Sequence, residues 1–505
     1  MNSIVCNQGY IINKDQISEL ILKEVKKELK VKPYIQGARS KLAKSFKIYR
    51  ENDDKLCIPK FYGYQKFGKP NKNAFLKGTN IKLKFGGSLR DYQLDVIKNV
   101  VPKIKNQEGG IISLPPGRGK TVIACKLISE LKKKTLVIVH KTFLLNQWKN
   151  RIEQFLPKAR VGIVQGKIMD VEDKDIVIGM LQSLSLKDDY PDDLFDDIGC
   201  IIFDECHHLS AEKFSQILQK ISVPYMIGLS GTPKRADKLD FVLEYYIGNM
   251  LYYEKPQINQ EILVNIYKFT MEHERFTMVF NKYTKEAQVS TMITNLVELV
   301  ERNEFIVSLI KQCRDNKARK LLVLSDRLDH LEFMKNKVDE LECGSTSKYI
   351  GGMKQEKLDV AEEADIIFST YSMSSEALDI SSLNTIILST SRKNVEQSVG
   401  RILRNQKGNY LAQPLVIDIV DSLRTFTNQG YTRKTYYKKI TNFDNILTYS
   451  YKDGKITEDP RKERKQTNNK ETNNKETNNK ETSKFVDSDE DDDEDKSLFI
   501  NSDSD

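Results

Sequence analysis

The sequence has few cysteines and no long apolar run. Its seven cysteines are odd in number and form no C-x-x-C pair, which argues against a disulfide framework and against a cysteine-based zinc site. Cys206, His207 and His208 are adjacent, and neighbouring side chains do not easily converge on one metal ion. No apolar stretch has the length of a membrane span, and the first residues lack the basic-then-apolar layout of a signal peptide. We therefore expect a soluble, intracellular protein with reduced thiols and no membrane partner.

The charge of the chain is unevenly distributed. The formal net charge is +9, but residues 487–505 hold ten acidic side chains and one lysine, so the rest of the chain carries +18. A basic body indicates a polyanionic partner such as nucleic acid, although a lysine-rich surface that serves only solubility would give the same count. Residues 456–505 are low in complexity, with T-N-N-K-E repeated three times before the acidic stretch, and we expect a disordered acidic tail.

The N-terminal residues 1–87 predict a small, basic α+β module. They hold nineteen Lys and Arg against seven Asp and Glu. An amphipathic pattern predicts a helix over Gln16–Lys30, and alternating apolar residues around a polar turn predict a β-hairpin over residues 45–63. Tyr62, Tyr64 and Phe67 alternate with lysines there. These rings would either stack on nucleic-acid bases or pack into a core.

The rest of the chain is organised around Gly110–Thr121, GIISLPPGRGKT. A short apolar run leads into a glycine-rich turn, and Lys120 and Thr121 then open a helical pattern. Exposed backbone N–H groups and the positive end of the helix dipole make such a turn an anion site. Lys120 would add a charge for the β- and γ-phosphates, and Thr121 a hydroxyl for Mg²⁺. The strict G-x-x-x-x-G-K-[ST] pattern fails because Leu114 stands at its first glycine, so a structural glycine turn is the alternative.

Strand-like runs alternate with helical patterns after this loop, which predicts a doubly wound parallel sheet. The runs are Leu136–His140, Val161–Val164, Ile176–Ile178, Ile201–Phe203 and Met226–Leu229. Ligands of such sheets bind at the carboxyl ends of the strands, where Asp204, Glu205 and Ser230 stand. Asp204 suits Mg²⁺, and Glu205 suits a water that is to be oriented or deprotonated. A solvated acidic pair is the alternative.

A second α/β pattern begins at Leu321–Leu324 and has no phosphate loop of its own. Arg401 and Arg404 are three residues apart on one helix face, and two guanidinium groups there would reach a γ-phosphate bound to the first domain. Two solvated arginines are the alternative. Further strands are predicted at Ile366–Phe368, Ile386–Leu388 and Val416–Ile419. We place the two domains at 88–250 and 301–455, with a crossing over 251–300.

Taken in order, these stretches resemble the motifs of the superfamily 2 helicases and nucleic-acid translocases, over roughly residues 89–407. LPPGRGKT is similar to motif I, VIVHKTFLLNQW to motif Ia, IIFDECHH to motif II, GLSGTP to motif III, LLVLSD to motif IV, STYSMSSEALDIS to motif V and QSVGRILR to motif VI. Motif II reads DECH rather than DEAD, and GTPKRAD and the LRDYQ stretch before the phosphate loop are similar to the DNA-directed group that contains XPB, the phage UvsW helicase and the poxvirus transcript-release helicase. The Lys- and Asn-rich composition would suit a large DNA virus. Ala377 and Ser381 depart from the usual Gly and Pro of motif V.

The resemblance implies two tandem RecA-like parallel-sheet domains that use ATP and Mg²⁺. It implies these site residues: Gln93 for adenine; Pro115, Pro116, Gly117, Arg118, Gly119, Lys120, Thr121 and Asp379 for the nucleotide; Thr121 and Asp204 for the metal; Lys120, Asp204, Glu205, Gln397, Arg401 and Arg404 for catalysis. Our candidates for contacts with a nucleic-acid strand are Thr142, Ser325 and Thr370. Ser230 and Thr232 would couple the nucleotide state to domain closure.

The function that we expect is that of an ATP-dependent DNA helicase or translocase whose two domains close on ATP and reopen on hydrolysis. An RNA helicase is the first alternative, because only contacts to the 2′-OH distinguish RNA from DNA. The second alternative is an ATP-gated factor that remodels a transcription complex without unwinding. A viral protein of this kind would meet the transcription or replication machinery at the replication site of the host cell, and we expect it also in the virion.

Overall fold

The computed structural model describes residues 2–34, 43–186, 193–210, 212–231, 237–255, 262–376, 378, 380–403 and 411–460. Thr232, Asp379, Arg404 and nearly all of the predicted tail lie outside these residues. The chain divides into Met1–Asp459 and Pro460–Asp505, and the first of these units holds an N-terminal module and two lobes. Each part is described below on its own. Among the helices of the described ranges, none combines the length and the apolar character needed to cross a membrane.

The first lobe is built on a sheet of eight strands in the order β11-β10-β12-β9-β13-β14-β8-β15. The short β11 pairs antiparallel with β10, and the other pairs of the sheet are parallel. The five strands predicted after the phosphate loop are confirmed. The strands are β8 (Gly109–Ser113), β9 (Thr135–Val139), β10 (Val161–Gln165), β11 (Ile168–Met169), β12 (Ile176–Met180), β13 (Cys200–Phe203), β14 (Tyr225–Ser230) and β15 (Met250–Tyr253).

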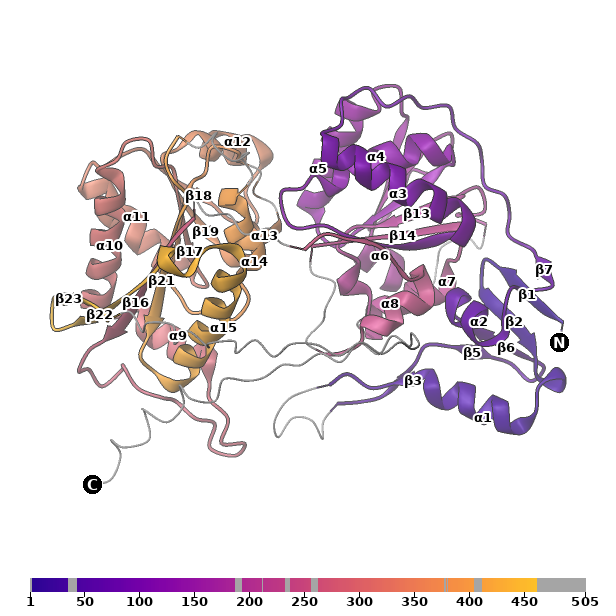
Figure 1. Ribbon diagram of the computed structural model, residues 1–505, viewed down its shortest axis with the longest axis horizontal. Coiled ribbons are helices and arrows are strands. Elements are labelled where there is room, and N and C mark those ends of the chain that lie inside the picture. The colour runs from indigo at the N-terminus through magenta and orange to yellow at the C-terminus, as the bar shows by residue number, and fades with distance from the viewer. Residues whose placement is uncertain are drawn as a thin grey trace, which may run out of the picture. The chain divides into compact units, whose positions relative to one another are not determined.

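Helices cover both faces of this sheet, which explains why its inner strands are apolar throughout. Side chains alternate along a strand, so Val137 and Ile202 belong to one hydrophobic cluster while Ile138 and Phe203 belong to the other. The first cluster is covered by α3 (Asp91–Gln107), α4 (Lys120–Leu131) and α5 (Thr142–Phe155). The second is covered by α6 (Leu181–Leu186), α7 (Glu212–Lys220) and α8 (Asp240–Ile247) (Figure 1).

The second lobe has the same plan, with strand order β18-β19-β17-β20-β21-β16-β22-β23. Helices α10 and α11 cover one face, and α12, α13, α14 and α15 cover the other. The strands are β16 (Leu263–Thr270), β17 (Leu321–Ser325), β18 (Thr346–Tyr349), β19 (Ile366–Thr370), β20 (Thr385–Leu388), β21 (Leu415–Asp421), β22 (Ile446–Lys452) and β23 (Lys455–Glu458). The helices are α9 (Val289–Val297), α10 (Val300–Arg314), α11 (Leu328–Glu340), α12 (Gln355–Glu363), α13 (Tyr371–Glu376), α14 (Glu396–Val399) and α15 (Arg424–Ile440). Two tandem parallel-sheet lobes confirm the predicted fold class.

The stretch predicted as a crossing between domains contains a strand of the second sheet. β16 pairs in parallel with β21 along its length and with β22 on its other side. Its sequence, LVNIYKFT, carries Asn265 and Lys268, so the continuous apolar run by which the other inner strands were recognised is missing. The crossing is therefore shorter than residues 251–300.

The N-terminal module combines a five-stranded sheet, in the order β5-β6-β2-β1-β7, with two helices and a two-stranded ladder. The predicted helix begins at Glu19, where the Ser18 hydroxyl accepts the N–H of Ile21 and caps the helix. The elements are β1 (Ser3–Cys6), β2 (Gly9–Asn13), α1 (Glu19–Glu28), β3 (Lys30–Val31), β4 (Phe46–Lys47), β5 (Arg50–Glu51), β6 (Lys55–Ile58), α2 (Lys60–Phe67) and β7 (Lys72–Asn73).

Tyr62, Tyr64 and Phe67 of the module pack in or against its core. β5 and β6 form the predicted hairpin, but the chain then turns into α2, which carries Tyr62, Tyr64 and Phe67. Tyr62 is buried and Tyr64 donates its hydroxyl to Glu108 Oε2 at 3.0 Å. Phe67 stacks on Tyr10. Because packing uses these rings, the base-stacking interpretation is wrong and the core alternative holds.

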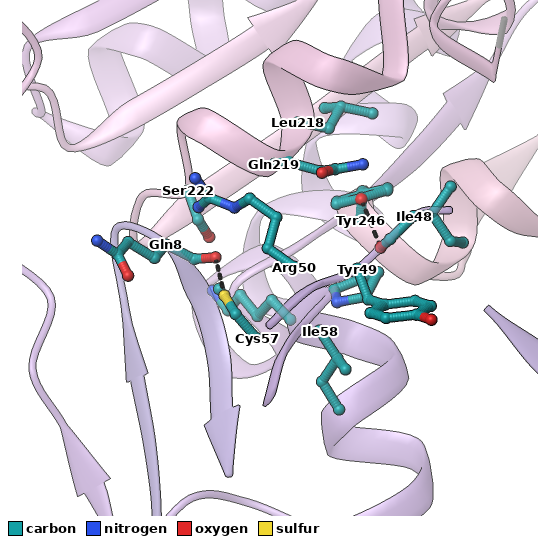
Figure 2. A pocket seen from close by; sticks show the side chains of 13 residues that line it. Gln8, Ile48, Tyr49, Arg50, Cys57, Ile58, Leu218, Gln219, Ser222 and Tyr246 are labelled. Atoms are coloured by element: carbon teal, nitrogen blue, oxygen red, sulfur yellow. Dashed lines mark hydrogen bonds between the residues drawn. The ribbon is translucent and has the colours of Figure 1, made fainter. Parts of the chain in front are cut away.

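The module and the first lobe share one hydrophobic cluster and a buried ion pair. The Lys60 side chain is 1% exposed, and its ammonium group lies 2.9 Å from Glu108 Oε2 and donates to Pro224 O at 2.9 Å. A hollow at this seam is lined by residues of both parts, among them Arg50, Cys57 and Ser222 (Figure 2). Across it the Tyr246 hydroxyl donates to Ile48 O at 2.9 Å. None of the predicted ATP-site residues lines this hollow.

Lys60 makes the stability of the protein depend on pH. Burial lowers its pKa to about 8, although the Glu108 carboxylate works against the shift. An unfolded lysine keeps its proton to about pH 10.4. Between these pH values the unfolded chain binds more protons than the folded one, so this residue adds stability as pH rises and removes it as pH falls through 8.

We therefore expect the wild type to gain stability relative to Lys60→Met between about pH 8 and pH 10, by on the order of 2 kcal/mol. Urea unfolding of both proteins across this range measures the difference. A difference that stays constant with pH would contradict the assignment.

Candidate active site

The predicted phosphate loop joins β8 to α4 over residues 114–119. Gly117 and Gly119 have φ angles of 79° and 71°, a left-handed backbone that favours glycine. At Gly119 an added Cβ would also lie 2.5 Å from Gln93 Nε2. Leu114 stands where the strict pattern has glycine. It is fully buried and its N–H donates to Ser230 O at 3.0 Å, so an apolar anchor replaces that glycine.

Lys120 and Glu205 form an ion pair at the carboxyl edge of the first sheet. Lys120 Nζ lies 3.1 Å from Glu205 Oε1, and the two side chains are only 14% and 15% exposed. The N–H of Gly231 donates to Glu205 Oε2 at 3.2 Å, and His207 Nδ1 lies 3.4 Å from the same oxygen. Glu205 also has a φ of 48°, a conformation that is uncommon outside glycine and is held by these surroundings.

The two adjacent carboxyl groups have opposite pKa shifts. Burial raises the pKa of Asp204 above its usual range, and the charge of Glu205 raises it further. Burial also opposes ionisation of Glu205, but the positive charges of Lys120 and His207 outweigh it and lower the pKa of Glu205. Glu205 is therefore the carboxyl group that holds its charge most firmly.

Asp204 is oriented by the single tryptophan of the chain. Trp148, buried on α5, donates its indole N–H to Asp204 Oδ2 at 2.8 Å. The Asp204 carboxylate and the Thr121 hydroxyl are oxygen groups of the kind that Mg²⁺ prefers. In the described ranges no group of three or more His, Cys, Asp and Glu side chains could hold a metal by itself. A nucleotide and water would therefore have to supply the remaining ligands of an ion held at Asp204.

Gln93 is placed against the phosphate loop. Its side chain is buried, Oε1 accepts the N–H of Arg90 at 3.0 Å, and Nε2 donates to Arg118 O at 3.4 Å. The amide thus joins the start of α3 to the loop, a contact that the sequence did not reveal. Its selection of adenine stays a prediction.

In the second lobe, Gln397 lies half-buried on α14. Arg401 lies on the following 3₁₀ turn and donates to Ser374 O at 2.7 Å and to Leu378 O at 2.9 Å. Asp379 and Arg404 lie outside the described residues. The approach of these four residues to the phosphates stays a prediction.

The three candidate strand contacts differ in exposure. Thr142 is exposed at the start of α5, and Thr370 is half-buried at the end of β19. Ser325 at the end of β17 is fully buried, and its hydroxyl lies 2.9 Å from His330 Nδ1. The contact of Ser325 with a nucleic-acid strand stays a prediction, as do those of Thr142 and Thr370.

Ser230, predicted as a coupling residue, lies between the loop and the acidic pair. Its carbonyl accepts the N–H of Leu114, and its hydroxyl lies 3.2 Å from His207 Nδ1. Thr232 is outside the described residues. Trp148 and His207 are functional neighbours that the sequence analysis missed. The sequence signals for Trp148 are its place at the end of the stretch similar to motif Ia and its being the one tryptophan of the chain.

Comparisons with known proteins agree with this site. A family model described as "Type III restriction enzyme, res subunit" matches residues 86–235, which contain the phosphate loop and the acidic pair. L396 of Acanthamoeba polyphaga mimivirus, named as a candidate ATP-dependent RNA helicase, is 38% identical over 444 residues, 85% of this chain and 84% of its own length. XPB2 of Sulfurisphaera tokodaii, named a DNA 3′-5′ translocase, is 35% identical over 164 residues, 32% of this chain and 35% of its own.

Among solved structures, a fragment described as an HsdR subunit of a type I restriction enzyme from Vibrio vulnificus YJ016 shares the fold. Its TM-score is 0.52 at 15% identity, and the match covers 74% of this chain and 71% of that one. A phosphate loop and an acidic pair at the carboxyl edge of a parallel sheet define an ATP-hydrolysing motor lobe. The chain belongs to the superfamily 2 helicases, as its motifs predicted, and is a nucleic-acid-dependent ATPase.

Replacing Trp148 by Phe tests the orientation of Asp204. The variant removes the N–H that Asp204 Oδ2 accepts, so the pKa of Asp204 should rise further and its hold on Mg²⁺ should weaken. We expect the Mg²⁺ concentration for half-maximal ATPase activity to rise about tenfold. The acid limb of the pH–rate profile should move to higher pH, because Asp204 must be ionised to hold a cation.

Asn150→Ala, at an exposed position of the same helix, is the matched control and should leave both quantities unchanged. A folded Trp148→Phe protein with the wild-type Mg²⁺ dependence would contradict the role of the indole.

Proposed function

We propose that the protein is an ATP-dependent helicase or translocase that moves along DNA, using ATP bound at the phosphate loop of the first lobe. The observation that carries the proposal is the Lys120–Glu205 ion pair, held by Gly231 and His207 at the edge of the sheet. It supports the proposal because Lys120, which would bind the phosphates, lies beside a carboxylate suited to act on water.

The ion pair suggests the order in which Lys120 and Glu205 act. A bound triphosphate offers Lys120 a more highly charged anion than Glu205 does, so Lys120 would move toward the phosphates. Glu205 then loses the cation that lowers its pKa, and its affinity for a proton rises. In that state Glu205 would orient the attacking water and accept its proton.

Mg²⁺ would be held by Thr121 and Asp204, and when bound it neutralises charge on the phosphates. Trp148 keeps the Asp204 carboxylate turned toward that position. Gln397, Arg401 and Arg404 would complete the site from the second lobe, and Asp379 would contact the nucleotide. Ser230 is hydrogen-bonded to both the loop and His207, and it would couple the nucleotide state to domain closure.

The choice of DNA rests on the sequence motifs and on the named activity of XPB2, which is 35% identical to this chain over 164 residues. The name of L396 favours RNA as the second candidate. Thr142 and Thr370 are the strand contacts that we propose. Backbone contacts carry most of the affinity in either case, so binding should fall steeply with salt. Action in the infected cell, contact with transcription or replication machinery and packaging in the virion stay predictions.

The experiment is to measure ATP turnover with matched single-stranded DNA, duplex DNA and RNA. We expect DNA to stimulate turnover more than RNA does, and Glu205→Gln to lower the stimulated rate by about 100-fold or more while ATP still binds. Stronger stimulation by RNA would favour the RNA helicase. Turnover that ignores all three polymers would contradict both candidates, and stimulation without strand displacement or movement would indicate an ATP-gated remodelling factor.

A further inference from the structure

We propose that Glu254 is a positioning residue for the phosphate loop, and that Arg118 is the attachment point of Glu254 rather than a ligand of the phosphates. This inference rests on the proposed function, because it concerns the loop at which ATP would bind. Glu254 directly follows β15, the edge strand that pairs with β8. It belongs to none of the motifs quoted above.

Glu254 holds the loop at both of its ends. Its backbone N–H donates to Ser113 O at 3.0 Å, at the last residue of β8. Its carboxylate accepts two bonds from Arg118 near the other end, Nε to Oε2 at 3.2 Å and Nη2 to Oε1. The two attachments bracket residues 114–117. A forked, two-point ion pair of this kind fixes the plane of the guanidinium group as well as its position.

The guanidinium plane and the backbone carbonyl of Arg118 make further contacts. The guanidinium carbon lies 3.6 Å from the centroid of the Tyr92 ring, which gives a cation–π contact. The Arg118 carbonyl accepts bonds from the Tyr92 hydroxyl at 3.1 Å and from Gln93 Nε2 at 3.4 Å. Tyr92, Gln93 and Glu254 all lie outside the loop. They hold Arg118 from elements on either side of it, and the Glu254 carboxylate neutralises its charge.

This arrangement gives the loop its shape before any nucleotide arrives, and a preformed loop loses less conformational freedom on binding. Without the Glu254 carboxylate, the loop gains freedom and ATP binding should weaken. The acidic pair that does the chemistry is untouched, so the turnover number should change much less than the affinity. If Arg118 were instead a phosphate ligand restrained by Glu254, loss of the carboxylate would release a positive charge and tighten ATP binding.

The test uses the full chain, a fluorescent ATP analogue with Mg²⁺ and no nucleic acid, and compares Glu254→Gln, Arg118→Ala and the double variant. We expect each single variant to raise the dissociation constant by about 5- to 20-fold, and the double variant to be no worse than either single one. Glu254→Asp and Arg118→Lys should be intermediate. The turnover number with nucleic acid present should stay within about threefold of the wild type.

Glu130→Gln is the matched control. It breaks the Lys126–Glu130 ion pair, 2.7 Å long, further along the same helix α4, and should leave ATP binding unchanged. Tighter binding by Glu254→Gln, an unchanged dissociation constant in that variant, or a much larger loss in Arg118→Ala than in Glu254→Gln would each overturn the inference. If the wild-type protein bound no ATP at all, the proposed function would be contradicted. If it bound ATP but nucleic acid did not stimulate turnover, the proposed function would be contradicted while the inference about Glu254 would stand.

Discussion

The ion pair between Lys120 and Glu205 is the interaction on which the account of this motor depends. A cation and a carboxylate of low exposure attract each other, and Lys120 keeps Glu205 ionised in surroundings that disfavour its charge. The same pair blocks both groups from their proposed tasks while no nucleotide is bound. A triphosphate that takes over Lys120 would therefore also release Glu205. One contact would then link substrate binding to the activation of water.

The parallel sheet makes this contact possible. β14 pairs with β13 on one side and with β8 on the other. The phosphate loop, the acidic pair and Ser230 therefore lie at the carboxyl ends of three adjacent strands, at one edge of the sheet. Side chains then refine the geometry: Trp148 orients Asp204, and Gln93 meets the loop where only glycine fits. In the second lobe, buried Arg302 pairs with Asp421, and Arg433 with Asp418, so two charged carboxylates are fixed on β21 inside the core. Removing one partner of such a pair typically costs about 3–5 kcal/mol.

The sequence allowed the fold class, the predicted strands and the loop residues of the first lobe to be predicted, because short apolar runs and glycine turns act locally. β16 escaped prediction because Asn265 and Lys268 interrupt its apolar pattern. Tyr62 and Phe67 were open to two interpretations, because a ring beside lysines has the same sequence pattern in a core and on a binding surface. The burial of Ser325 could not be predicted, because a position at a strand end says nothing about exposure. Glu254 lies 136 residues from Arg118, and no local pattern connects them.

The most direct test is a crystal structure of the protein with Mg²⁺ and a non-hydrolysable ATP analogue. The account predicts the triphosphate at residues 115–121, with Lys120 Nζ moved from Glu205 to the phosphates and Glu205 facing the γ-phosphate. A structure in which the nucleotide is bound while the 3.1 Å contact between Lys120 and Glu205 persists would contradict it.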